Sequence, residues 1–229
     1  MLLFFDFDGT LADSSPGIYR SFELACTKLN LEIPSFQSFR NAIGPPVQRL
    51  AKRFFPDLTD SGLEEFRLIF RNDYDHYSFR QCDWYEGAQS TIAALAASPE
   101  MSLAIITNKP TNPTLELLKA GGILDCIQFV VGIDYRIRLN LGPEFATKTD
   151  AIQLALSLVK TRFSAVVYIG DTPSDQEASA NCDVQFIAAT YGFHRWQNSE
   201  LVNTKRITAI GDLISLLEGM VSNDDAYAC

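Results

Sequence analysis

Five short runs of consecutive apolar residues recur along the chain. They are nearly continuous in apolar character, which is typical of strands covered on both faces of a parallel sheet. Helical stretches near 112–120, 146–160 and 173–181 separate the last four runs. This alternation predicts right-handed strand–helix–strand units and an α/β fold, an open parallel Rossmann-like sheet with helices on both faces. The predicted strands are Leu2–Phe5, Leu103–Ile106, Ile127–Val131, Ala165–Ile169 and Val184–Ala188.

The interval between the first two runs is far longer than a crossover connection needs, and it has a helical pattern of its own. Stretches 15–30 and 47–55 have helical spacing of apolar residues. We therefore expect a small helical domain at 15–82, inserted into an α/β core formed by 1–14 and 83–229. Its aromatic residues are expected to form its core. One aromatic and apolar helix face comprises Leu63, Phe66, Phe70, Tyr74 and Tyr77.

The amino-acid composition and net charge of the chain limit the kinds of partner that it is expected to bind. The chain has 229 residues, 47% of them hydrophobic, which is enough for a sizeable core. Its 28 Asp and Glu exceed its 19 Lys and Arg, and the net charge of -9 argues against nucleic acid or an anionic membrane as partner. Five scattered cysteines without a C-x-x-C spacing indicate neither a disulfide framework nor a zinc site. The first apolar run is too short for a signal peptide or a membrane span, so we expect a cytoplasmic protein.

Polar residues and one glycine follow three of the predicted strands, at the sheet edge where open α/β folds bind ligands, and a lysine stands at the start of the helix predicted at about 146. Each residue alone has an ordinary explanation as a turn residue, a helix cap or a surface lysine. Their convergence on one edge is much harder to explain in that way. The set comprises Asp6, Asp8, Gly9, Thr107, Asn108, Lys148, Asp171 and Asp175.

The charge of this set predicts a bound cation. Its four carboxylates outnumber its single ammonium group, and such an excess is too repulsive to stand unpaired in a partly desolvated site. Oxygen ligands of this kind suit Mg²⁺, which takes one or two carboxylates and keeps several waters. We therefore expect Mg²⁺ as the cofactor.

Four segments resemble the motifs of the haloacid dehalogenase-like hydrolase superfamily: DFDGTLADS, IITNKP, Lys148 and YIGDTPSD. The chain is most similar to phosphoglycolate phosphatase-like members, whose helical cap is inserted after the first motif. The resemblance extends from Leu2 to about Phe193. It implies a magnesium-dependent phosphatase that hydrolyses a small phosphorylated metabolite, a phosphoglycolate-like phosphomonoester, through an aspartyl-phosphate intermediate.

The resemblance also implies a role for each residue of the set. Asp6 would be the nucleophile, and Asp8 would be the general acid and then the general base. Thr107, Asn108 and the backbone N–H groups around Gly9 would hold the phosphoryl oxygens, which Lys148 would neutralise. The metal ligands would be Asp6, the Asp8 carbonyl group and Asp171, with Asp175 orienting waters or Lys148.

Several alternatives remain open at this level. A sugar-phosphate phosphomutase or a pyrophosphatase would use the same motifs, and a non-catalytic, phosphoryl-accepting switch is a further possibility. Lys109 competes with Lys148 as the phosphate-binding lysine. Substrate selection is expected from the cap loop at Gly44 and Arg49 and from Arg136, because arginines suit an anionic substrate group.

Overall fold

Six strands pair in parallel into one sheet in the computed structural model, which describes residues 1–225. The strand order is β5-β4-β1-β6-β7-β8, so β1 lies between β4 and β6. Phe4 of β1 is in register with Ala104 of β4 and Tyr168 of β6. The predicted fold class is confirmed. The strands are β1 (Leu2–Phe5), β4 (Ser102–Ile106), β5 (Phe129–Val131), β6 (Val166–Gly170), β7 (Gln185–Ala189) and β8 (Lys205–Ile207).

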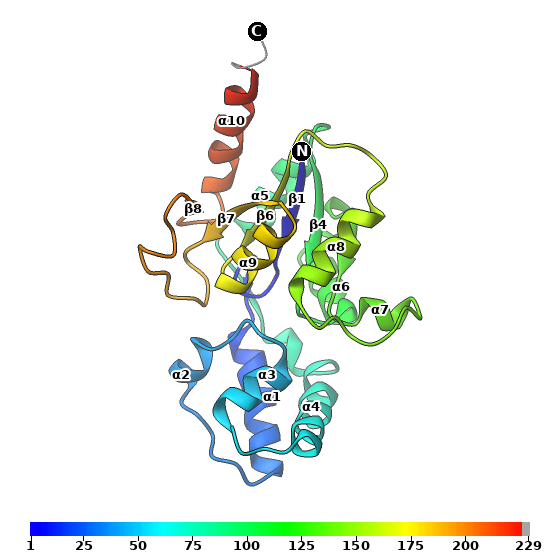
Figure 1. Cartoon of the computed structure of the whole chain (residues 1–229), viewed down its shortest axis with the longest axis vertical. Coiled ribbons are helices and arrows are strands. Elements are labelled where there is room, and N and C mark those ends of the chain that lie inside the picture. Colours follow the sequence, from blue (N-terminus) through cyan, green and yellow to red (C-terminus); the bar gives the residue numbers. More distant parts are fainter. Residues whose placement is uncertain (226–229) are drawn as a thin grey trace.

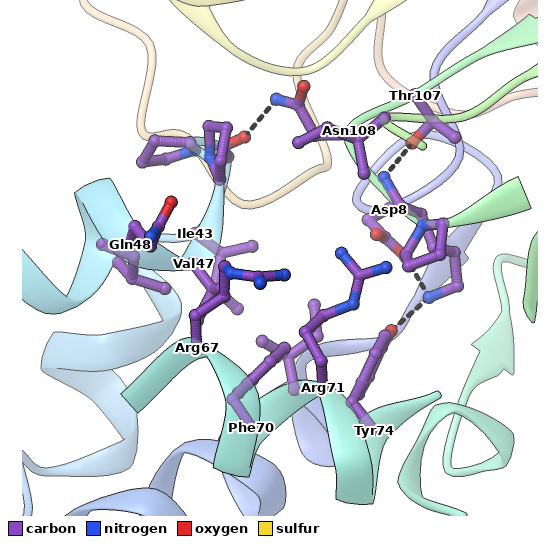
Figure 2. A pocket seen from close by; sticks show the side chains of 18 of the residues that line it. Asp8, Ile43, Val47, Gln48, Arg67, Phe70, Arg71, Tyr74, Thr107 and Asn108 are labelled. Atoms are coloured by element: carbon purple, nitrogen blue, oxygen red, sulfur yellow. Dashed lines mark hydrogen bonds and ion pairs between the residues drawn. The ribbon is translucent and has the colours of Figure 1, made fainter. Parts of the chain in front are cut away.

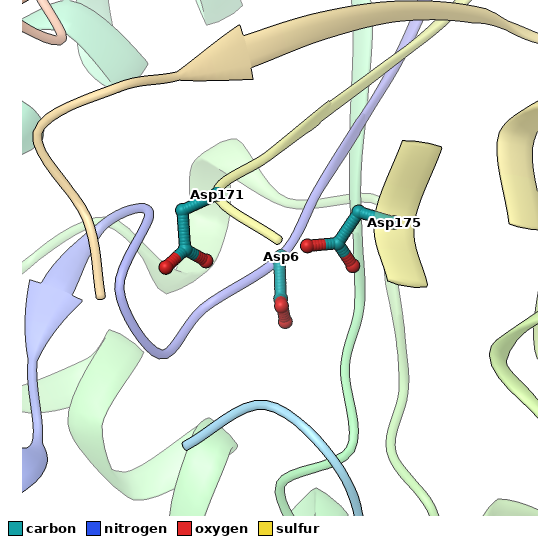
Figure 3. Close-up of side chains that lie close together, drawn as sticks. All are labelled: Asp6, Asp171 and Asp175. Carbon is teal, nitrogen blue, oxygen red and sulfur yellow. The ribbon is translucent and has the colours of Figure 1, made fainter. Parts of the chain in front are cut away.

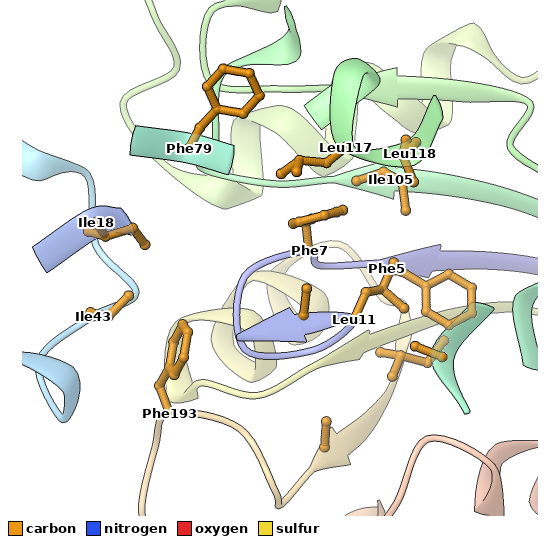
Figure 4. Close-up of a cluster of buried hydrophobic side chains, with 14 of the residues drawn as sticks. Phe5, Phe7, Leu11, Ile18, Ile43, Phe79, Ile105, Leu117, Leu118 and Phe193 are labelled. Atoms are coloured by element: carbon orange, nitrogen blue, oxygen red, sulfur yellow. The ribbon is translucent and has the colours of Figure 1, made fainter. Parts of the chain in front are cut away.

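Helices cover both faces of the sheet. Successive side chains of a strand point to opposite faces, and all four side chains of β1 are apolar and buried, so both faces need cover. Leu3 and Phe5 belong to a buried cluster with residues of α5, α6 and α10, whereas Leu2 and Phe4 belong to a second cluster with residues of α8 and α9. Figure 4 shows Phe5 and neighbouring side chains of the first cluster. These helices are α5 (Ala88–Ala96), α6 (Thr111–Ala120), α8 (Lys148–Leu158), α9 (Pro173–Asn181) and α10 (Asp212–Asp225).

Four helices lie together at one end of the molecule, away from the sheet (Figure 1). Their aromatic side chains pack on one another: the ring centroid of Phe22 lies 4.8 Å from that of Phe39 and 4.8 Å from that of Phe66. Such contacts account for much of the stability that short helices need. We call residues 15–82 the cap. Its helices are α1 (Ser15–Lys28), α2 (Phe36–Arg40), α3 (Val47–Phe54) and α4 (Asp60–Tyr74).

A short two-stranded sheet joins the two chain segments that run between cap and α/β core. β2 (Ala12–Asp13) pairs antiparallel with β3 (Asp83–Trp84). Arg40 of the cap forms an ion pair with Asp13 at 3.1 Å, beside this junction. The boundaries at 14/15 and 82/83 remain a prediction, and this sheet lies at both of them.

Some elements carry no strong sequence pattern and were not predicted. β8 has one buried residue, Ile207, and two exposed ones. The four-residue helix α7 (Tyr135–Arg138) has no buried residue. Tyr77, expected on the apolar face of α4, follows the end of this helix and is 70% exposed. Within residues 1–225 no helix is both long and apolar enough to cross a membrane.

Candidate active site

Three neighbouring strands end at one edge of the sheet and bring the predicted polar residues together. Asp6 and Asp8 follow β1, Thr107 follows β4, and Asp171 follows β6. The Asp6 N–H donates to the Ile169 carbonyl group at 2.9 Å, which continues the β1–β6 pairing one residue beyond the strand. The carboxyl ends of parallel strands meet at the same edge, and the side chains that follow them therefore share one site.

Asp6 is buried against Lys148, the first residue of α8. The Lys148 ammonium group donates to Asp6 Oδ2 at 2.6 Å and also to Asp175 Oδ1. Thr147 and Asp150 form a capping box that fixes the start of α8, and this fixes the position of the Lys148 backbone. Lys148 is only 5% exposed, so it is a buried counter-ion and not a surface lysine.

Asp6, Asp171 and Asp175 form an acidic cluster (Figure 3). One carboxylate oxygen from each lies within 4.8 Å of the others. Asp171 accepts hydrogen bonds from the Phe193 N–H at 2.7 Å and the Thr10 hydroxyl at 3.3 Å. Asp175 Oδ2 accepts from the N–H and hydroxyl groups of Thr172 at 2.9 and 2.7 Å. The three carboxylates are therefore held facing one another.

The cluster is short of positive charge. Burial raises the pKa of Asp6 to about 6; Lys148 acts in the opposite direction and Asp175 adds to the rise. Burial also raises the pKa of Asp171 well above its ordinary value, and the charges of Asp175 and Asp6 raise it further. A divalent cation between these oxygens would reverse both effects, and the all-carboxylate donor set fits Mg²⁺.

Gly9 lets the loop after β1 approach Asp171. Its φ of +82° lies in the left-handed region, and a Cβ atom here would be 2.2 Å from Asp171 Oδ2. Its N–H, expected to face phosphate, donates instead to the Ala12 carbonyl group at 2.8 Å. The contribution of Gly9 in this structure is therefore steric.

Asp8 has a different environment from Asp6. Its Oδ1 accepts a hydrogen bond from the Lys109 ammonium group at 2.9 Å, and Lys109 also bonds the hydroxyl group of Tyr74 in α4. Figure 2 shows this chain of contacts at the edge of a cavity. The two candidate lysines thus do not compete for one place, because Lys148 pairs with Asp6 and Lys109 pairs with Asp8.

The cavity lies between the cap and the edge of the sheet. Its empty space is about 760 Å³, including the part open to solvent. Asp6, Asp8, Thr107 and Asn108 line its floor, and Asn108 donates to the Gly44 carbonyl group of the cap at 2.8 Å. Apolar side chains from the cap form much of its wall: Ile18, Ile43, Val47, Leu50 and Phe70. The cap aromatics were expected only as a core, but Phe70 and Tyr74 also line this cavity.

Two arginines of α4 point into the cavity (Figure 2), and neither was singled out from the sequence. Arg67 is held by Glu64 through two hydrogen bonds of 2.9 and 2.6 Å. Arg71 pairs with Asp75 at 2.7 Å and with Glu144 of the α/β core at 3.2 Å. Their spacing of four residues places them on one helix face with Tyr74. This spacing is the feature of the sequence that could have indicated a shared position for these three residues.

The three predicted specificity residues have different positions. Gly44 lines the cavity. Arg49 donates to the Ala146 carbonyl group at 2.9 Å, at an exposed contact between cap and core. Arg136 lines a separate surface hollow and donates to the Leu141 carbonyl group at 3.1 Å, so it is not part of the cavity wall.

The chain is similar in sequence and in fold to several known proteins. A phosphoglycolate phosphatase from Photobacterium profundum is 28% identical over 84% of this chain and 84% of its own. The tyrosine-protein kinase PtkA of Mycobacterium tuberculosis is 23% identical over 96% of this chain and 72% of its own. Among solved structures, a haloacid dehalogenase-like hydrolase from Streptococcus pneumoniae superposes with a TM-score of 0.80 at 25% identity, covering 94% of this chain and 97% of that one.

The family model for haloacid dehalogenase-like hydrolases matches residues 3–189. This span begins in β1, runs through the cap and ends with β7, so it includes the carboxylates and lysines of the site described above; Phe193, whose N–H donates to Asp171, follows it. The chain belongs to the haloacid dehalogenase-like hydrolase family and is a phosphoglycolate phosphatase-like member of it.

Proposed function

We propose that this protein is a magnesium-dependent phosphatase that hydrolyses a small phosphomonoester through a phosphorylated Asp6. One observation carries the proposal. Two carboxylates only two residues apart have separate environments, since Asp6 faces Lys148 in the acidic cluster and Asp8 faces Lys109 at the cavity. Each carboxylate is therefore held in place by a lysine of its own, which lets Asp6 and Asp8 take different parts in one reaction.

In the first step, an Asp6 carboxylate oxygen attacks phosphorus as the ester P–O bond breaks. Protonated Asp8 gives its proton to the leaving oxygen, and the substrate alcohol departs. In the second step, a water oxygen attacks the same phosphorus while Asp8 takes a proton from that water. The bond between phosphorus and Asp6 then breaks, inorganic phosphate leaves, and Asp8 is protonated again for the next cycle.

Residues around Asp6 are suited to holding the phosphoryl oxygens. Lys148 donates to Asp6 and Asp175, so its positive charge lies next to the carboxylate that would attack phosphorus. The Thr107 hydroxyl oxygen accepts from the Lys109 N–H at 3.2 Å, so its proton can point to a ligand. We assign phosphate binding to Thr107, Lys148 and Asn108.

Asp6 and Asp171 would hold Mg²⁺ together with the backbone carbonyl group of Asp8. When bound, Mg²⁺ supplies positive charge that offsets the charge developing on the phosphoryl oxygens. Both oxygens of Asp175 already accept hydrogen bonds from Lys148 or Thr172. We therefore assign to Asp175 the orientation of Lys148 and of waters.

The cap would close the cavity and limit the access of bulk water during transfer. The leaving alcohol would lie against its apolar wall and beneath the arginines of α4. We place the enzyme in the cytoplasm with small phosphorylated metabolites as its substrates.

Phosphate release from 4-nitrophenyl phosphate, with MgCl₂ and with a chelator, tests this function. We expect activity that needs Mg²⁺ and that falls by orders of magnitude in Asp6→Asn. Asp57→Asn, which alters an exposed carboxylate of the cap, should retain full activity. Full turnover by Asp6→Asn would overturn the proposal. Transfer of the phosphoryl group from the substrate to another organic acceptor instead of water would indicate a phosphomutase.

A further inference from the structure

Lys109 is enclosed between the α/β core and the cap. Its side chain is 0% exposed, and its ammonium group bonds both Asp8 Oδ1 and the Tyr74 hydroxyl group. The same nitrogen lies 4.7 Å from the ring centroid of Tyr74 and 5.4 Å from that of Phe7. A cation buried this deeply persists only where such partners compensate its lost hydration.

The core fixes the backbone of Lys109, and the cap fixes one partner of its ammonium group. The Lys109 N–H donates to Thr107 Oγ1 at 3.2 Å, and its carbonyl group accepts from the Ile133 N–H at 3.2 Å. Tyr74 belongs to α4, which Arg71 joins to Glu144 of the core at 3.2 Å. The contacts of the ammonium group are therefore complete only while α4 packs against the core.

Neutralising a charge is not a sufficient reason for this arrangement. Replacing a buried ion pair with apolar residues of similar volume is often neutral or stabilising, so such a pair is weak evidence for a role in stability. The Lys109 contact also selects one oxygen of Asp8. Within residues 1–225 no hydrogen bond reaches Asp8 Oδ2, while Oδ1 is held by Lys109.

We propose that Tyr74 and Lys109 are positioning residues that hold Asp8 Oδ1 and thereby direct Oδ2 toward the leaving oxygen of the substrate. This inference rests on the proposed phosphatase function. It makes proton donation depend on the packing of the cap, because Lys109 loses its hydroxyl partner when α4 moves away. Phosphoryl transfer to Asp6 would then be assisted by Asp8 only under a closed cap.

Two substrates of similar shape separate positioning of a proton donor from general damage. Phenyl phosphate needs protonation of its leaving oxygen far more than 4-nitrophenyl phosphate, because 4-nitrophenolate is a more stable anion. For both, kcat/KM covers the steps up to departure of the alcohol. General acid assistance is typically about 10²- to 10⁴-fold. We expect Lys109→Met to lower kcat/KM for phenyl phosphate by about 10²-fold and that for 4-nitrophenyl phosphate much less.

Tyr74→Phe removes one oxygen atom and keeps the ring that packs on Phe70. We expect Tyr74→Phe to lower kcat/KM for phenyl phosphate relative to kcat/KM for 4-nitrophenyl phosphate by about 3- to 10-fold, the effect of one hydrogen bond. In the Lys109→Met background it should change the ratio no further. The matched control is Tyr77→Phe, at a tyrosine that is 70% exposed, and its ratio should equal that of the wild type.

The outcomes separate the two claims. The positioning role would be overturned if Tyr74→Phe and Lys109→Met lowered kcat/KM equally for both substrates, or if neither variant lowered it. The phosphatase proposal would stand in either case as long as the wild-type protein is active. A wild-type protein inactive on both substrates with Mg²⁺ would overturn both claims.

Discussion

Lys148→Met tests whether the buried ammonium group compensates the acidic cluster. Lys148 bonds Asp6 Oδ2 at 2.6 Å and also Asp175, and its side chain is 3% exposed. Met keeps most of the length and apolar volume of the side chain and removes the charge. The change therefore leaves two carboxylates of the cluster without their cation.

The structure gives the size of the effect. Breaking a buried ion pair by removing one partner costs about 3–5 kcal/mol, because a buried charge remains unpaired. For a chain of this size, each kcal/mol shifts Tm by about 2–4 °C, so we expect Tm to fall by about 6–20 °C without added metal. Lys148 opposes the rise in the pKa of Asp6, so without it this pKa should rise further above about 6. Protonated Asp6 would then relieve part of the repulsion, and the loss should be smaller in acid than at neutral pH.

Thermal unfolding followed by circular dichroism, in a chelator and then in excess MgCl₂, provides the measurement. Mg²⁺ should raise the Tm of Lys148→Met more than that of the wild type, because a cation at the cluster takes over part of the missing compensation. Lys160→Met, at an exposed lysine, is the control and should leave Tm unchanged. A chelator-treated Lys148→Met within about 1 °C of the wild type would refute the electrostatic reasoning.

Two further predictions concern the same cluster. Gly9→Ala forces a Cβ atom to within 2.2 Å of Asp171 Oδ2 at a φ of +82°. We expect this variant to lower the free energy of unfolding in urea by at least about 2 kcal/mol and to lose most of the phosphatase activity. Gly211→Ala, with open space at its Cβ, should change neither quantity. Unchanged stability and activity in Gly9→Ala would contradict the close approach. The rise in Tm caused by Mg²⁺ should shrink as pH falls from about 8 to about 5. Protons compete with the cation for Asp6, because the pKa of Asp6 is raised to about 6 without metal. The metal-free fold also gains stability when Asp6 binds this proton, since the pKa of Asp6 is higher in the folded protein than in the unfolded chain. A constant metal-induced shift over this range would show that Asp6 is not a ligand.

The sheet was predictable because its buried strands have a strong pattern. The first apolar run, Leu2–Phe5, coincides with β1, and four other runs overlap β4, β5, β6 and β7. β8 was not predictable because it is a short edge strand with two exposed residues, stabilised by pairing with β7 and by the burial of Ile207. Such an element depends on tertiary contacts that leave little trace in local periodicity.

The floor of the site was predictable for a geometric reason, since strand ends in a parallel sheet converge. The contact between Lys109 and Tyr74 was not predictable, because it joins residues of different elements at the boundary of cap and core. The helical spacing correctly placed Phe70 and Tyr74 on one face of α4. It did not show that the same face meets the cavity, because periodicity gives a buried face without naming what covers it.

Trapping phosphate on Asp6 tests the central claim most directly. In Asp8→Asn the second step lacks its general base, while 4-nitrophenolate can still leave unassisted, so the phosphorylated protein should accumulate. With phosphorus-labelled 4-nitrophenyl phosphate and Mg²⁺, we expect a rapid burst of 4-nitrophenolate and label on the peptide that contains Asp6 after acid quenching. The Asp6→Asn, Asp8→Asn double variant should give neither. Label that persists in the double variant, or that is found on another peptide, would contradict the assignment of Asp6 as the nucleophile.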